Sequence, residues 1–135
     1  MASLQAHLEQ IERNNKTRSD LQRIGTAPEW VVTIAFYEAL HLMEAILVTV
    51  GDNGLCHNDH QSRNRCLQVH PQTKHLYIAY HKLFDLSIWA RYLEKGGAKY
   101  DARDPSMVSK ATGVWLKAIR DYAKSLKIAV PAAEV

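Results

Sequence analysis

The stretch that decides the fold is APEWVVTIAFYEALHLMEAILVTVG, residues 27–51, an apolar run of more than twenty residues. Pro28 and Glu29 are typical of a first helical turn, and Gly51 follows the run as a helix stop. The run is apolar almost all round, which is typical of a helix that is buried among other elements. The sequence therefore predicts one long buried helix here.

Three polar residues interrupt this helix at regular spacing. Glu38, His41 and Glu44 follow one another at intervals of three residues and form a polar seam. Two interpretations stay open: the seam is a network of satisfied polar groups, or it lines a functional site or a subunit interface. The segment is long enough to span a membrane, but charge at mid-bilayer is unfavourable, so we expect no membrane partner.

The segment before this helix has the helical period as well. Leu4, Leu8 and Ile11 form one apolar stripe, with Ser3 as a candidate N-cap. After a polar interval the apolar pattern resumes and runs up to Gly25, a candidate C-cap. A helix is therefore predicted to precede the long one.

Three further helices are expected downstream. A short one begins near residue 59 or 61 and ends by Pro71, because the residue before a proline disfavours helical geometry. In TKHLYIAYHKLFDLSIWARYLEKGG, residues 73–97, Thr73 is a candidate cap and Gly96 and Gly97 are the stop. The last lies in DPSMVSKATGVWLKAIRDYAKSLKIAV, residues 104–130.

No segment shows the sustained alternation with a period of two that indicates a strand. The predicted fold class is therefore all-α, a four- to five-helix up-and-down bundle. A chain of 135 residues suits a single domain over 1–135. We expect its core over 28–127 and a frayed C-terminal tail over 131–135.

The chain is mildly basic, with 17 Lys+Arg against 14 Asp+Glu, which permits an anionic partner without requiring one. Its two cysteines, Cys56 and Cys66, and the absence of a signal-peptide pattern predict free thiols and a cytoplasmic location. The last third predicts either an electrostatic patch or an ordinary solvated helix face. Its basic residues are Lys99, Arg103, Lys110, Lys117, Arg120, Lys124 and Lys127.

A second stretch, HNDHQSRNRCLQVHP at residues 57–71, concentrates residues with functional chemistry. Zinc ligands are available in Cys56, His57, His60, Cys66 and His70, but their spacing fits no standard zinc pattern. A catalytic thiol at Cys56 would need His57 as its base, but adjacent side chains such as these rarely meet. We therefore expect no bound metal and no cofactor.

Helical geometry groups the arginines and histidines of this stretch. Arg63 and His70 are two turns apart and share one face, which His60, three residues before Arg63, joins. Arg65 points about 140° away from His70. An arginine offers a planar fork to phosphate oxygens, and a histidine can take a proton from a ribose 2′-hydroxyl. RNA cleavage without a metal requires these groups.

Arg63 and Asn64, followed by His70, resemble the R-x(4–6)-H motif of HEPN domains, in which the residue after the arginine is often Asn. The phrases AFYEALHLMEA, HQSRN and YHKLFDLSIWARY are similar to those of small bacterial HEPN proteins, over residues 30–92. The resemblance implies a helical bundle that pairs as a homodimer and brings both motifs to a shared cleft. It implies either a metal-independent endoribonuclease, often of toxin–antitoxin or phage-defence systems, or a non-catalytic HEPN module that binds protein or nucleic acid.

By matching positions, Arg63 would hold the scissile phosphate, Asn64 would orient it and His70 would be the general acid or base. His60 is an equally well placed candidate for that role. The implied partners are RNA, a second copy of the chain, and an antitoxin or other controlling protein.

The segment SIWARY, residues 87–92, adds a second arginine beside an aromatic residue. Arg91 and Tyr92, together with Arg65, are the candidate substrate-binding residues. The alternative is an ordinary helix end with a surface arginine and a packed tyrosine.

Overall fold

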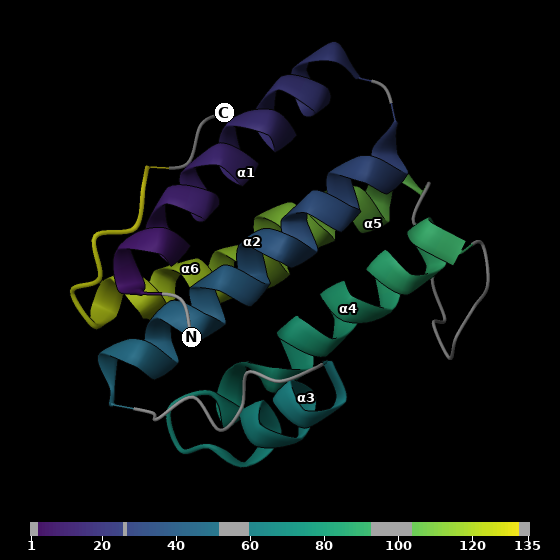
Figure 1. Ribbon diagram of the computed structural model, residues 1–135. Helices are drawn as coiled ribbons and strands as arrows, with labels where there is room; N and C mark the ends of the chain where they lie inside the picture. The colour runs from purple at the N-terminus through teal and green to yellow at the C-terminus, as the bar shows by residue number, and fades with distance from the viewer. Residues whose placement is uncertain (1–2, 26, 52–59, 93–103, 133–135) are drawn as a thin grey trace.

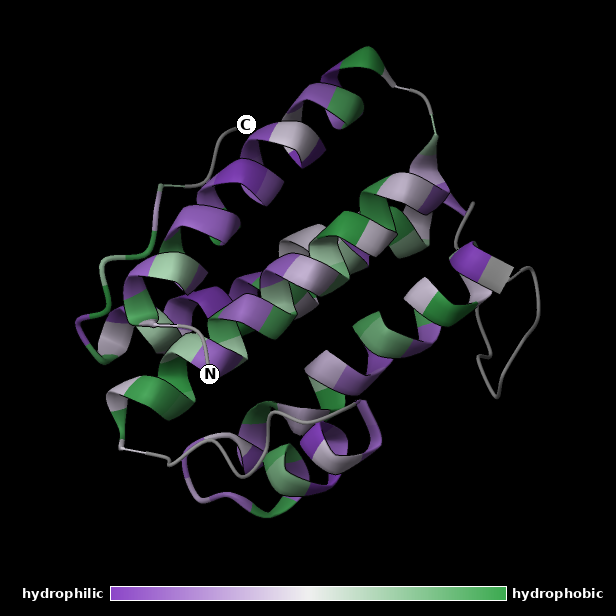
Figure 2. Ribbon diagram, viewed as in Figure 1, coloured by the Kyte–Doolittle hydropathy of each residue, from purple (hydrophilic) through white to green (hydrophobic). Residues whose placement is uncertain are grey.

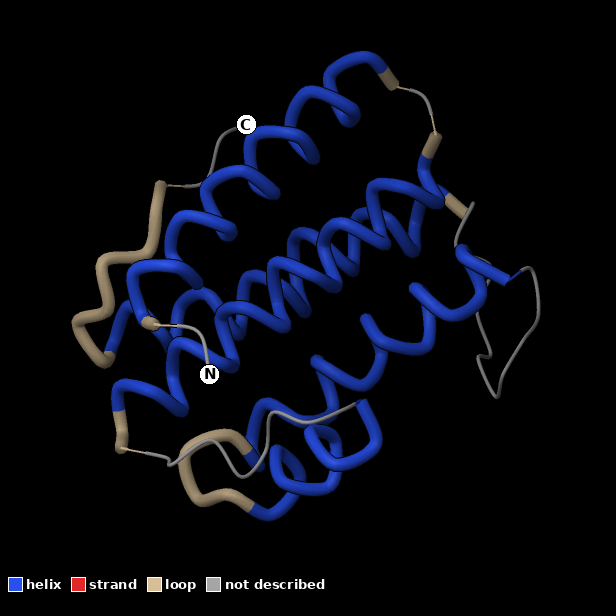
Figure 3. The backbone as a smooth tube through the Cα atoms, viewed as in Figure 1, coloured by secondary structure: helices blue, strands red, loops and turns tan. Residues whose placement is uncertain are grey.

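Figure 1 shows a computed structural model, which describes residues 3–25, 27–51, 60–92 and 104–132 apart from the side chain of Tyr92. Its helices are α1 (Leu4–Ile24), α2 (Pro28–Thr49), α3 (His60–Val69), α4 (Tyr77–Tyr92), α5 (Pro105–Lys110) and α6 (Leu116–Ser125). A 3-10 turn, η1 (Lys74–Leu76), leads into α4, and a π-helical turn, η2 (Ala111–Trp115), joins α5 to α6 without a break. These ranges contain no strand (Figure 3), so the prediction of an all-α bundle is confirmed.

The central helix is α2. It packs against α1 on one side, α4 on the other and α6 behind (Figure 1). Phe36, Leu42 and Met43 of α2 are completely buried. By length and composition α2 is the described helix that would suffice to cross a membrane, but 78% of the window concerned is buried inside the bundle. Its all-round apolar character is thus accounted for by helices on several sides.

The ends of α1 and α2 follow signals in the sequence. Ser3 Oγ accepts a hydrogen bond from the Ala6 N–H at 3.1 Å, as an N-cap does. Gly25 and Gly51 have φ angles of 78° and 87°. This left-handed region is open to glycine because glycine has no Cβ. Both helices therefore end at the predicted glycines.

The start of α4 differs from the prediction. Thr73 makes no capping hydrogen bond, and its fully buried hydroxyl donates to the Leu67 carbonyl at 2.9 Å. Thr73 therefore ties the turn after Pro71 back to α3, and the chain enters α4 through η1. The predicted stop at Gly96 and Gly97 lies outside the described residues.

The basic residues of the last third divide between surface and interior. Arg120 is only 5% exposed and donates to the Pro131 carbonyl, so its assignment to a surface patch is wrong. Lys117 is exposed, and its Nζ forms an ion pair with Asp121 Oδ2 at 2.6 Å. The other described members are exposed, namely Lys110, Lys124 and Lys127, while Lys99 and Arg103 lie outside the described residues.

The chain after α6 turns back beside α1 (Figure 1). Asn15 Nδ2 donates to the Ala132 carbonyl at 2.8 Å, and Arg120 binds the carbonyl of Pro131. The first two residues of the expected frayed tail are therefore held by hydrogen bonds. Residues 133–135 lie outside the described part of the chain.

Candidate functional site

Arg63 lies in an ion pair between α3 and α2. Its Nε is 2.7 Å from Glu44 Oε1, and the two side chains are 13% and 4% exposed. The buried Tyr80 side chain of α4 is within the electrostatic reach of Arg63: burial raises the pKa of Tyr80, and the charge of Arg63 opposes that rise. Arg63 therefore reaches into the bundle, and part of its guanidinium is already engaged.

His60, at the start of α3, is the histidine that contacts Arg63. Its Nδ1 lies 3.4 Å from Arg63 Nη1. Because a guanidinium has no lone pair to offer, Nδ1 is the acceptor and the neutral ring carries its proton on Nε2. The ring packs against Phe36 and Phe84, at centroid distances of 6.0 Å and 5.6 Å. These aromatic contacts hold the imidazole beside Arg63.

His70 directly follows α3 and is engaged elsewhere. Its Nδ1 accepts a hydrogen bond from the Gln72 N–H at 3.1 Å, so the neutral ring carries its proton on Nε2. Gln72 is itself held from α6, because its side-chain oxygen accepts from the Tyr122 hydroxyl at 2.5 Å. No hydrogen bond or ion pair joins His70 to Arg63 within the described residues. The structure thus brings His60 and Arg63 together but shows no such contact for His70.

Asn64 and Arg65 lie on other faces of α3. The Asn64 Oδ1 is buried and has no hydrogen-bond partner among the described residues. Arg65 is exposed and borders a hollow of about 310 Å³, together with Ser62, Cys66 and Val69. Neither residue shares the contacts of Arg63 with Glu44 and His60.

The Cys66 sulfur is in a disulfide bond, so the prediction of free thiols is wrong at this residue. Cys56, the other cysteine of the sequence, lies outside the described residues. A disulfide at Cys66 gives no support for a reducing compartment.

Arg91 faces α2. Its Nη1 donates to the Tyr37 hydroxyl at 3.2 Å, its Nη2 donates to Ser87 Oγ at 3.2 Å, and its guanidinium lies 5.9 Å from the Tyr37 ring centroid. Arg91 is thus half-buried at the α2–α4 interface, and it is not a fully solvated surface arginine. The side chain of Tyr92 lies outside the described residues.

The polar seam of α2 is the feature that the sequence indicated without assigning partners. Glu38 forms a buried ion pair with Arg18 of α1, His41 Nδ1 lies 3.0 Å from His7 Nδ1, and Glu44 binds Arg63. The seam therefore divides between α1 and α3. Of the three seam residues, Glu44 is the one that contacts Arg63 of the candidate site. The three-residue spacing along α2 was the sequence signal that singled out Glu44.

Burial dominates the electrostatics of this seam. It raises the pKa of Glu38, against the hydrogen bond and charge of Arg18, which lower it. Burial, His7 and Arg63 together lower the pKa of His41 to about 4. His41 is therefore a neutral imidazole at neutral pH, and it lies within the electrostatic reach of Arg63.

Within the described ranges, no three His, Cys, Asp or Glu side chains lie close enough together to hold a metal ion. Cys56 and His57, two of the zinc ligands considered from the sequence, lie outside those ranges.

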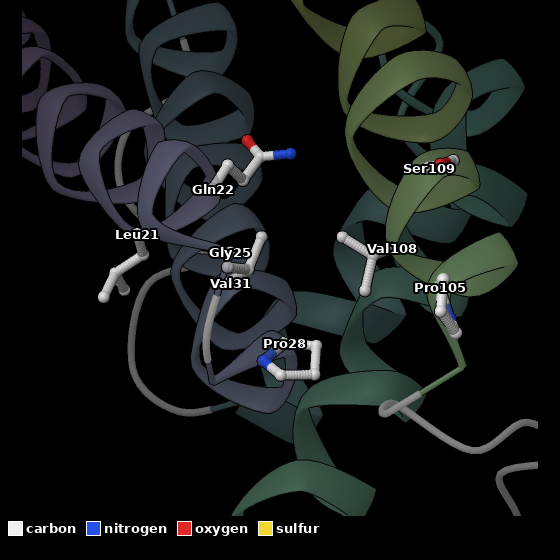
Figure 4. A pocket seen from close by; sticks show the side chains of 8 residues that line it. All are labelled: Leu21, Gln22, Gly25, Pro28, Val31, Pro105, Val108 and Ser109. Carbon is white, nitrogen blue, oxygen red and sulfur yellow. The ribbon is translucent and has the colours of Figure 1, made fainter.

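A separate groove of about 330 Å³ lies between the α1–α2 turn and α5 (Figure 4). Val108 of α5 points across it toward α2, where Val31 and Pro28 form the opposite wall. None of the residues that the sequence predicts for the site lines this groove, so the groove and the Arg63 cluster are distinct features.

Comparison with known proteins found no matching family model, curated protein or solved structure. The class that the structure defines is an all-α helical bundle whose central helix binds polar side chains from two neighbours.

Proposed function

We propose that this protein is a metal-independent endoribonuclease of the HEPN type, with Arg63 as the phosphate-binding residue and His60 as the general base. The observation that carries the proposal is the contact of 3.4 Å between Arg63 Nη1 and His60 Nδ1. It puts a cation that can bind a phosphate beside an imidazole lone pair that can accept a proton.

The proposed step is attack of a ribose 2′-oxygen on the adjacent phosphorus. The His60 Nδ1 takes the 2′-hydroxyl proton, a bond forms between the 2′-oxygen and phosphorus, and the bond to the 5′-oxygen breaks. A contact of 3.4 Å is at the long end of hydrogen bonding, so a substrate hydroxyl can replace Arg63 as the partner of Nδ1. The leaving 5′-oxygen takes a proton from water and the proton gained by His60 returns to solvent, while the neutral His70 ring can donate a hydrogen bond to the 5′-oxygen through its Nε2–H.

Glu44 has a positioning role in this proposal. It binds Arg63 through Nε, which leaves the Nη edge of the guanidinium turned to other partners. Arg65 and Arg91 are proposed RNA contacts, with RNA as the substrate. In the HEPN arrangement a homodimer would bring two such sites to one cleft, under control of an antitoxin or another protein.

The test is cleavage of labelled single-stranded RNA in the presence of EDTA. We expect His60→Gln and Arg63→Lys each to lower the cleavage rate by about 10²- to 10⁴-fold, the usual contribution of a general base or a preorganised charge. His70→Gln should slow the reaction less than His60→Gln does. Equal cleavage by wild type and both variants would refute the proposal, and the reverse order of the two histidines would reassign the base.

A second candidate, a non-catalytic HEPN module for protein or nucleic-acid binding, is favoured by one observation. Arg63 is 13% exposed and is already bound to the nearly buried Glu44, as a structural arginine is. On this view wild-type protein cleaves no RNA, and Arg63→Gln and Glu44→Gln lower the melting temperature alike. The mass of the protein in solution tests the homodimer that the HEPN arrangement implies. A monomer would contradict the shared cleft.

A further inference from the structure

Among the described helices, α1 packs extensively against α2 alone, whereas α2, α4 and α6 all pack against one another. Figure 2 shows that hydrophilic residues dominate much of α1. Its buried residues are mostly polar, namely His7, Ile11, Asn15, Arg18 and Ser19. Polar contacts therefore contribute more to the docking of α1 than to the docking of any other long helix in the described residues.

Two of these contacts join α1 directly to the seam of α2. Near the start of α1, His7 Nδ1 lies 3.0 Å from His41 Nδ1, and the two rings are 5.2 Å apart at an angle of 45°. Near its end, Arg18 binds the fully buried Glu38. The histidine contact requires one Nδ1 to donate and the other to accept, so it exists only while at least one ring is neutral.

The surroundings of the histidine pair oppose a second proton. The charged groups that act on His41 are His7 of α1 and Arg63 of α3. Arg63 is engaged by Glu44, one turn after His41 on α2. On the other packed elements, Arg91 of α4 is bonded to Tyr37, and Arg120 of α6 acts on Glu38. If both rings were cationic, two N–H groups would face each other at a distance of 3.0 Å.

We propose that α1 is an acid-labile cover on α2: protonation of the His7–His41 pair releases α1 while α2, α4 and α6 remain packed. Release uncovers His41 and Glu38 and opens the surface of α2 beside the Arg63 cluster. This pH-dependent release is independent of the proposed ribonuclease function, because it concerns only the docking of α1 on α2.

The direction of the effect follows from linkage. The pKa of His41 is about 4 in the docked state and returns toward 6.5 when α1 leaves. Its contribution to docking is therefore fully present above pH 6.5 and is lost as the pH falls from 6.5 toward 4. Glu38 acts in the opposite direction: burial raises its pKa, so its contribution is greatest at low pH and declines as the pH rises.

The test is hydrogen–deuterium exchange of the full chain, corrected for intrinsic exchange rates, for wild type and His41→Gln. Because both proteins contain Glu38, its titration cancels in the ratio of their α1 exchange rates. We expect this ratio to rise by up to about tenfold for each pH unit below 6.5, as one extra bound proton requires. Peptides of α2, α4 and α6 should keep their protection.

A ratio that stays constant with pH overturns the proposal, and so does loss of protection in α2 together with α1, because that is global unfolding. His81→Gln is the matched control: His81 lies on α4 near Asp85 and is 44% exposed, so it should leave α1 exchange unchanged. If His41→Gln does not fold, His7→Gln removes the same pair from the α1 side and is held to the same outcomes.

Discussion

The two interfaces of α2 are built from different chemistry. Toward α4 and α6 it meets side chains such as Leu83, Leu86 and Ile119, all completely buried. Toward α1 it meets Arg18 and His7, and the Asn15 side chain accepts a further hydrogen bond from Arg18. Apolar burial is nearly independent of orientation, whereas a buried polar group is stable only with its partner in place. The α2 surface that faces α4 and α6 therefore depends little on side-chain orientation, whereas the surface that faces α1 depends on specific polar partners.

The largest effect is expected in the apolar interface. Phe36 is completely buried, with Tyr80 and Phe84 at centroid distances of 5.6 Å and 5.5 Å. Phe36→Ala should lower the free energy of unfolding by about 3–5 kcal/mol, because it removes apolar contact and leaves a cavity. Denaturant titration measures this. Ile78→Ala, at a residue that is 69% exposed, is the matched control with a change under about 0.5 kcal/mol. Similar losses in both variants would contradict the described core.

The polar interface should respond differently to single and double changes. Arg18→Met leaves the carboxylate of Glu38 buried without its main partner and should lower the free energy of unfolding by about 3 kcal/mol. Adding Glu38→Gln should recover part of that loss, because no unpaired carboxylate remains. A double variant as unstable as the sum of the single ones would show that the two side chains are not coupled. Lys117→Gln, in the exposed pair with Asp121, should leave the denaturation midpoint unchanged.

The smallest of these effects concerns a single neutral hydrogen bond. Thr73→Val keeps the shape of a fully buried side chain but removes the bond to the Leu67 carbonyl. The free energy of unfolding should fall by about 1 kcal/mol, the usual net value of one such bond. Denaturant titration beside Phe36→Ala gives the comparison directly. A loss as large as that of Phe36→Ala would mean that the turn after α3 contributes more than this bond.

Much of the fold was predictable because its signals are local. The apolar run of α2, the Ser3 cap and the two glycine stops each act over a few residues, and the structure has all of them. Thr73 occupies the predicted N-cap position, at the start of η1, but its hydroxyl binds the Leu67 carbonyl, six residues earlier, and makes no local capping bond. Sequence spacing alone does not decide between these two bonds.

The candidate site was predictable to a smaller extent. Helical spacing allowed both His60 and His70 to join Arg63, since residues three and seven positions apart share one face of a continuous helix. The structure places His60 beside Arg63 because Phe36 and Phe84 hold its ring, and it turns the Nδ1 of His70 to a backbone N–H. Partners from α2 and α4 made that distinction, and no local pattern contains them.

By itself the sequence determined that the chain is helical, where the helices run and that α2 is buried, because the period of apolar residues and the helix-end residues act within one segment. Tertiary structure alone decided which partners the seam meets: Arg18 for Glu38, His7 for His41 and Arg63 for Glu44. The physical reason is that a buried charge or imidazole takes its properties from whichever helix is packed against it. That packing is settled by the whole core.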